Sequence, residues 1–160
     1  LGNFSNEQVN SFLAQISSYM QNDDYLLITC DTNNDKESLL KAYDNVYAKN
    51  LVLNSLKHID ALLGNKINFQ HIKIVCNWDE KEKVIRNCFI SSKTQVLQIN
   101  NFTLKILANK KYNIVNSHKF DTFIISKRFA KYHLRMLTHF ISHKKRMAIY
   151  VFKLNKKDME

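Results

Sequence analysis

Residues with the chemistry for catalysis or metal binding are few in this sequence and widely spaced. Asp31 ends an apolar run, and His118 and His133 follow far downstream, so nothing fixes the geometry of a site built from these three. The six histidines show no metal-ligand spacing with the cysteines, and we expect no metal site. No paired carboxylates and no Ser/His/Asp arrangement stand out either. A hydrolase or a metal enzyme is therefore the weakest hypothesis, and no catalytic residue is assigned.

The three cysteines, an odd number, lie inside apolar runs typical of strands: Cys30, Cys76 and Cys88. None of them belongs to a CxxC pair. This usage predicts buried free thiols in a reducing compartment, and we expect a cytoplasmic protein. No apolar run approaches the roughly 18 residues that a transmembrane helix needs, so we expect no membrane partner.

The chain is strongly basic, with 24 lysines and arginines against 14 acidic residues and a net charge of +10. An excess of this size attracts phosphates and anionic surfaces through its long-range field. The bases are spread along the chain apart from one tight cluster, Lys144-Lys145-Arg146. That cluster has two interpretations, a solvated hairpin tip or part of a nucleic-acid footprint.

The first elements are a helix and a strand. Ser5, followed three residues later by Gln8, forms the capping-box pattern, and an apolar stripe predicts an amphipathic helix over residues 6–21. Residues 25–31 form a continuous apolar run that ends in Asp31. Such a run is typical of a buried parallel strand whose carboxyl end carries a polar group.

The rest of the chain predicts two helices, a meander, a helix and a hairpin. Apolar spacing predicts a helix from about residue 36, which includes Val46 and Tyr47, and another over about 50–63, which Gly64 ends. The apolar period then shortens to two, which predicts an antiparallel meander of four strands over residues 71–78, 84–92, 94–99 and 102–108. A helix over about 118–130 and a hairpin of strands 133–141 and 147–154 complete the chain.

This order of elements indicates a mixed α/β sheet that looks incomplete. Only one parallel-type strand precedes the meander, whereas a doubly wound sheet has several strands with crossover helices before such a point. The sequence starts with Leu1 in what looks like a strand-to-helix connection, without an initiator Met or a signal segment. We therefore expect a truncated part of a larger domain.

Several short motifs occur in an order that identifies a family. They are the opening LGN, YLLITCD (25–31), LLKAYDN (39–45), Asn54, Trp78, Thr94-Gln95 and NSHKF (116–120). Together they resemble the C-terminal half of the histidine-specific, S-adenosylmethionine (SAM)-dependent methyltransferases, the group that includes the Nα-trimethylating enzyme of ergothioneine synthesis. The similarity extends over the whole chain.

The resemblance implies a fold and its division into domains. The fold class is α/β, the late part of a Rossmann-like methyltransferase sheet with an inserted α+β substrate domain. Residues 1–33 and 120–160 would belong to the methyltransferase domain, and residues 34–119 would form the insert. The cofactor would be SAM, but its glycine-rich loop would lie upstream, because the chain's two glycines, Gly2 and Gly64, cannot form such a loop.

The resemblance also implies four substrate-binding residues. Asn3 matches the family asparagine that binds the substrate's α-carboxylate or amine, and Tyr43 matches the AYD tyrosine near that carboxylate. Ser117 matches a serine that contacts the substrate imidazole, and Asn87 aligns with a methionine of the substrate pocket. Asn3 could instead be a turn residue, and Tyr43 a packed helix residue.

Two departures from the family pattern concern specificity. The family glutamate that accompanies the serine aligns with Val115, and a pocket aromatic residue aligns with Leu53. Valine cannot accept a hydrogen bond from a histidine ring, and the loss of a charge-assisted bond costs about 1.5–3 kcal/mol. Histidine is therefore doubtful as the substrate, and a related amino acid or a peptide amine stays open.

Two classes of function follow. The leading one is SAM-dependent methyl transfer to the amino group of a small, amino-acid-like acceptor, in which the chain's residues only position the acceptor. The isolated chain would then be inactive. The alternative is a truncated or degenerate non-enzymatic interaction module that binds nucleic acid through its basic surface. A cut sheet exposes an edge, so we also expect a homodimer or a domain swap.

Overall fold

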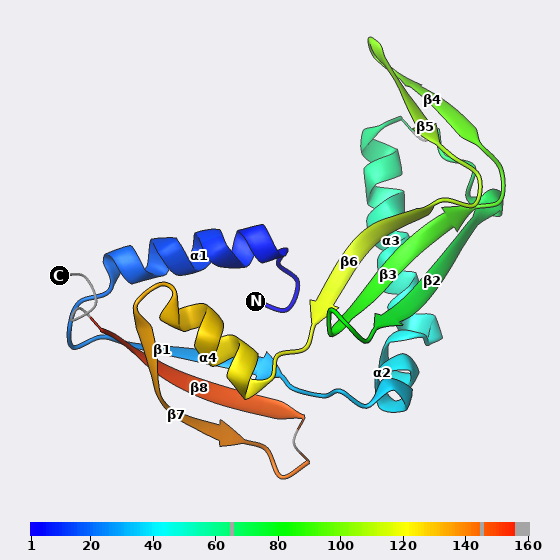
Figure 1. Ribbon diagram of the computed structural model, residues 1–160. Coiled ribbons are helices and arrows are strands. Elements are labelled where there is room, and N and C mark those ends of the chain that lie inside the picture. The colour runs from blue at the N-terminus through cyan, green and yellow to red at the C-terminus, as the bar shows by residue number, and fades with distance from the viewer. Residues whose placement is uncertain (65, 145, 156–160) are drawn as a thin grey trace. The chain divides into compact units, whose positions relative to one another are not determined.

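The computed structural model describes residues 1–64, 66–144 and 146–155 (Figure 1). The chain divides into two compact units. Unit 1 comprises Leu1–Asn34, Lys81–Val84 and the residues from Ser117 onward, and unit 2 comprises Asp35–Glu80 and Ile85–Asn116. Among the helices that the structure describes, none has the length and apolar character that a membrane span requires.

Unit 1 is a three-stranded antiparallel sheet with two helices. The elements are α1 (Asn6–Tyr19), β1 (Tyr25–Asp31), α4 (Thr122–Ala130), β7 (Leu134–Ile141) and β8 (Met147–Leu154). The strand order is β1-β8-β7, so β8 pairs with both of its neighbours. The predicted capping box is confirmed, because the Ser5 side chain accepts from Gln8 N and the Gln8 side chain accepts from Ser5 N. The predicted closing hairpin is confirmed as β7 and β8.

Both helices of unit 1 pack on the same face of the sheet (Figure 1). Val9 and Leu13 of α1 join Ile125 and Phe129 of α4 in a core cluster with buried strand residues. The strand members of this cluster are Cys30, Leu134, Ala148, Tyr150 and Phe152. The opposite face of the sheet carries exposed apolar side chains from all three strands: Tyr25, Leu27, Leu137, Phe140, Met147 and Ile149.

The sequence correctly predicts the bounds of β1 but not its surroundings. The prediction of a buried parallel strand is wrong for the described residues, since β1 pairs antiparallel with β8 and exposes Tyr25 and Leu27. An apolar run hides this alternation, because tyrosine and leucine occupy the exposed positions as well as the buried ones. Pairing with β8 depends on residues 147–154, far along the chain, which no local pattern reveals.

Unit 2 contains two helices, a sheet and a separate hairpin. The helices are α2 (Lys36–Tyr43) and α3 (Val46–Leu62), and a 3-10 turn, η1 (Phe69–His71), precedes the strands. The strands are β2 (Ile72–Asp79), β3 (Val84–Ser91), β4 (Gln95–Ile99), β5 (Phe102–Ile106) and β6 (Lys111–His118). One sheet has the order β2-β3-β6, and β4 and β5 form a two-stranded hairpin. Residues at one end of β3 and of β6 belong to unit 1.

Two sequence predictions for this region are wrong. A single four-strand meander does not form, because the second neighbour of β3 is β6 and not β4. The helix predicted from residue 118 begins at Thr122, since β6, which the sequence did not predict, continues to His118. The end of α3 agrees with the sequence, since Gly64 has φ of +84°, a conformation that favours glycine.

Candidate functional site

The turn that carries Asn3 is hydrogen-bonded to the end of β6. Phe4 N donates to Leu1 O at 3.0 Å, which closes the turn before α1. His118 N donates to Gly2 O at 2.8 Å. Asn3 follows Gly2 in the sequence and Ser117 precedes His118, so each lies next to a residue that forms this bond. Both lie in unit 1, with Asn3 exposed and Ser117 half-buried.

A buried lysine joins the end of β1 to the end of β6. The Lys119 side chain is 0% exposed, and its Nζ lies 2.6 Å from Asp31 Oδ2 and 2.9 Å from Ser117 Oγ. An ammonium has only donors, so the Ser117 oxygen accepts this bond. Asp31 supplies the opposite charge that a buried ammonium requires. The sequence marked Asp31 as a strand-end polar group but did not identify Lys119.

Backbone bonds fix the same region. Phe120 N donates to Asp31 O at 2.9 Å, and Lys119 N donates to Lys83 O at 2.8 Å. The second oxygen of Asp31, Oδ1, accepts from Asn33 N at 2.9 Å. We call Asn3, Asp31, Ser117 and Lys119 the strand-end cluster. Its hydroxyl and its carboxamide are polar groups of the kind that orient a small acceptor rather than attack it.

Cysteine chemistry is not available beside this cluster at neutral pH. Burial raises the pKa of the Cys30 thiol to about 11, and burial likewise raises the pKa of Cys76 to about 11. All three cysteines are free; Cys30 and Cys88 are buried as predicted, while Cys76 is half-buried. Since the thiolate is the nucleophile, protonated thiols of this kind are unreactive.

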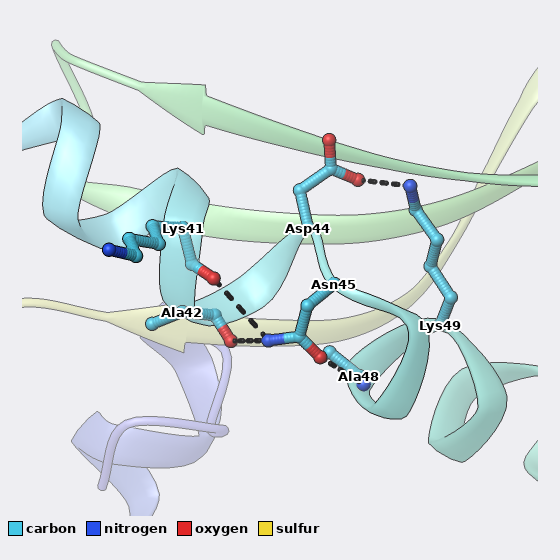
Figure 2. A network of polar contacts seen from close by, with 6 residues as sticks. All are labelled: Lys41, Ala42, Asp44, Asn45, Ala48 and Lys49. Carbon is cyan, nitrogen blue, oxygen red and sulfur yellow. Dashed lines mark hydrogen bonds and ion pairs between the residues drawn. The ribbon is translucent and has the colours of Figure 1, made fainter.

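Tyr43 lies in unit 2 at the last residue of α2, where one asparagine organises two helix ends (Figure 2). Asn45 Nδ2 donates to Ala42 O at 2.8 Å and to Lys41 O at 3.4 Å, while Asn45 Oδ1 accepts from Ala48 N at 3.0 Å. Asn45 thus satisfies carbonyls at the end of α2 and an N–H at the start of α3.

This junction corrects the predicted helix boundary. The helix predicted from about residue 36 included Val46 and Tyr47. In the structure, α2 ends before Asp44, and a separate helix, α3, starts at Val46. An ion pair of 2.7 Å between Asp44 and Lys49 spans the same junction (Figure 2). The position of Tyr43 therefore depends on a capped break between two helices.

Asn87, the fourth predicted residue, is buried in β3 with 5% of its surface exposed. It lies in unit 2, as do Tyr43 and the Val115 that stands at the family glutamate position. Asn3 and Ser117 thus lie in unit 1, each next in sequence to a residue of the Gly2–His118 hydrogen bond, and Tyr43 and Asn87 lie in unit 2. The assignment of these four residues to one substrate pocket stays a prediction.

The two glycines of the chain lie in separate turns. Gly64 follows the end of α3, and Gly2 lies in the turn before α1. A Cβ added at either glycine would make an ordinary van der Waals contact, at 3.6 Å, with its nearest protein neighbour. Within residues 1–64, 66–144 and 146–155, no group of three or more His, Cys, Asp or Glu side chains could hold a metal ion.

Comparison with known proteins gives one match at the level of a family. A family model described as "Histidine-specific methyltransferase, SAM-dependent" matches residues 1–154. A comparison with curated proteins found no match. Among solved structures, an S-adenosylmethionine-dependent methyltransferase from Clostridium acetobutylicum is similar, with 9% identity and a TM-score of 0.44 over 94% of this chain and 52% of that chain. The present chain thus spans about half the length of that chain.

Proposed function

Because this chain belongs to the histidine-specific, SAM-dependent methyltransferase family, we propose that it takes part in SAM-dependent methyl transfer to the amino group of an amino-acid-like acceptor. The observation that carries the proposal is the family match over residues 1–154. Nothing in the comparisons favours the alternative of a non-enzymatic module.

The strand-end cluster supports a role in holding the acceptor. Asn3 offers a carboxamide that both donates and accepts, which suits an α-carboxylate or an amine. Ser117 is held by Lys119 at 2.9 Å, so its hydroxyl keeps one orientation without loss of rotamer freedom on binding. Tyr43 and Asn87 belong to unit 2, and a role for them in acceptor binding is a separate proposal that rests on the family resemblance. In this proposal residues 1–33 and 120–160 belong to the methyltransferase part, and residues 34–119 form the substrate domain.

The proposed acceptor is an amino acid other than histidine, or a peptide amine. Val115 stands where the family has a glutamate and cannot accept from an imidazole N–H. The loss corresponds to about 1.5–3 kcal/mol of selectivity for histidine. Val115→Glu should therefore raise the preference for histidine over other amino acids.

We also propose that the SAM-binding loop lies outside residues 1–160, because the chain has two glycines, Gly2 and Gly64, which lie too far apart in sequence to form a glycine-rich loop. Calorimetric titration of SAM into residues 1–160 should then show no binding. Micromolar binding to this chain would contradict the proposed location of the loop and leave the family assignment intact.

Variants of the acceptor contacts test the proposed function. In the protein translated from the complete open reading frame, Asn3→Ala and Ser117→Ala should raise the KM for the amino-acid acceptor. The KM for SAM should stay unchanged. Ser11→Ala, an exposed position on α1, is the matched control and should change neither constant. An unchanged acceptor KM in both variants would contradict the proposed contacts.

A further inference from the structure

A groove of about 600 Å³ lies on unit 1, lined by residues of α1, of α4 and of the segment after α4. Its lining includes three cations, two amides and two aromatic rings: Lys127, Arg128, Lys131, Asn6, Asn10, Phe123 and Tyr132. None of these residues belongs to the strand-end cluster. We call this surface the α1–α4 groove, and its volume is in the range of sites that bind small molecules.

Arg128 is fixed in the groove entirely by neutral oxygens. Its Nη1 donates to Asn6 Oδ1 at 2.9 Å, and its Nε and Nη2 donate to Asn10 Oδ1 at 3.2 and 2.9 Å. Nη2 also donates to Asn6 O. Partial burial lowers the pKa of this guanidinium. The bonds hold the guanidinium rigidly but do not neutralise it.

The neighbouring cations are uncompensated as well. Lys127 and Lys131 are exposed, and in the part of the chain that the structure describes no carboxylate forms an ion pair with either of them or with Arg128. The two lysines are four residues apart, a spacing at which like charges repel on a helix. Three uncompensated charges within one turn form a ready site for an anion.

The helix dipole stabilises cations in the last turn of a helix, which explains in part why lysine and arginine gather at the carboxyl end of α4. It does not account for Phe123, a residue that lines the same groove and is 74% exposed. An exposed aromatic ring beside cations is the arrangement that binds a base by stacking and its phosphates by charge.

From these contacts we infer that the α1–α4 groove binds a nucleoside di- or triphosphate, with the phosphates on Lys127, Lys131 and Arg128 and the base on Phe123. The spacing favours a compact ligand over a nucleic-acid strand. The helix rises 1.5 Å per residue, so the two lysines are separated by about 6 Å along the axis, which matches a short polyphosphate rather than a track of several nucleotides. The inference is independent of the proposed function.

Titration of ATP, inorganic pyrophosphate and adenosine into ¹⁵N-labelled protein tests the inference. ATP should shift the amide signals of residues 6–10 and 123–132 with saturation, and its affinity should fall as salt rises. Phe123→Ala should weaken ATP binding and leave pyrophosphate binding unchanged. Lys127→Gln/Lys131→Gln should weaken both by about tenfold or more, because each substitution removes a charge-assisted contact.

The control is Lys36→Gln/Lys57→Gln, which removes the same charge from exposed positions in unit 2 and should leave ATP affinity within about twofold. Equal weakening in the control pair would overturn the inference in favour of a general charge effect. Absence of saturable ATP binding by the unsubstituted protein would also overturn it. A thymidine oligonucleotide that binds the groove more tightly than ATP would overturn the assignment to a free nucleotide.

Discussion

Among the polar contacts of unit 1, the ion pair between Lys119 and Asp31 should cost the most free energy of unfolding when it is broken. Asp31→Asn keeps the size of the side chain but removes its charge. Asp31 uses both carboxylate oxygens, Oδ1 for Asn33 N and Oδ2 for Lys119 Nζ. A carboxamide has one oxygen, so the variant loses one of these bonds and removes the negative charge that lies 2.6 Å from the buried ammonium of Lys119.

The expected cost follows from the burial of the two partners. Breaking a fully buried ion pair costs about 3–5 kcal/mol, and breaking an exposed one costs about 0–1 kcal/mol. Lys119 is 0% exposed and Asp31 is 31% exposed, which places this pair between the two limits. We expect Asp31→Asn to lower the free energy of unfolding by about 2–3 kcal/mol.

Urea denaturation followed by far-UV circular dichroism measures this change. Trp78, the single tryptophan of the chain, lies in unit 2, so its fluorescence monitors the other unit separately. The matched control is Asp44→Asn, which breaks the exposed pair with Lys49, 44% and 41% exposed, and should cost less than about 1 kcal/mol. Asp31→Asn costing no more than this control would refute the view that the buried ammonium depends on Asp31.

Three further predictions concern other parts of the chain. Asn45→Ala should destabilise unit 2 by about 1–2 kcal/mol, measured as a shift in the fluorescence-monitored urea midpoint, because it removes a cap shared by two helices; an unchanged midpoint would contradict the shared cap. Gly64→Ala should cost about 1 kcal/mol, measured by thermal unfolding, since φ of +84° strains any residue with a Cβ, and a gain in melting temperature would disprove the strain. Because burial raises the pKa of Cys30 from 9.0 to about 11, its contribution to stability is complete below pH 9 and is lost as the pH rises through 11. Cys30→Ala should therefore reduce the loss of stability between these pH values, and equal slopes for both proteins would contradict this origin.

Local signals in the sequence predicted much of the fold. The capping box of Ser5 and Gln8 located the start of α1, and the apolar period located β1, β7 and β8 to within one residue. These features depend on contacts between residues close in sequence. The break between α2 and α3 was missed because Val46 and Tyr47 continue the apolar spacing across the cap residue Asn45.

Features that depend on distant pairing were not predictable in this way. The pairing of β3 with β6 left β4 and β5 as a separate hairpin, although the short strands alone favoured a meander. The bond between Lys119 and Asp31 joins residues 88 positions apart, so the sequence marked the segment NSHKF (116–120) by resemblance but gave no sign that its lysine pairs with Asp31. Of the basic cluster predicted at residues 144–146, Lys145 lies outside the described residues, and its role stays a prediction.

The most direct test of the proposed methyl transfer uses the protein translated from the complete open reading frame. It is incubated with SAM and a panel of amino acids, and the products are analysed by mass spectrometry with fragmentation that locates each added methyl group. We expect methylation of the α-amino group of at least one amino acid other than histidine, with less product from Ser117→Ala. Absence of any methylated amino acid or peptide amine from the unsubstituted protein, while SAM binding is intact, would contradict the proposed function.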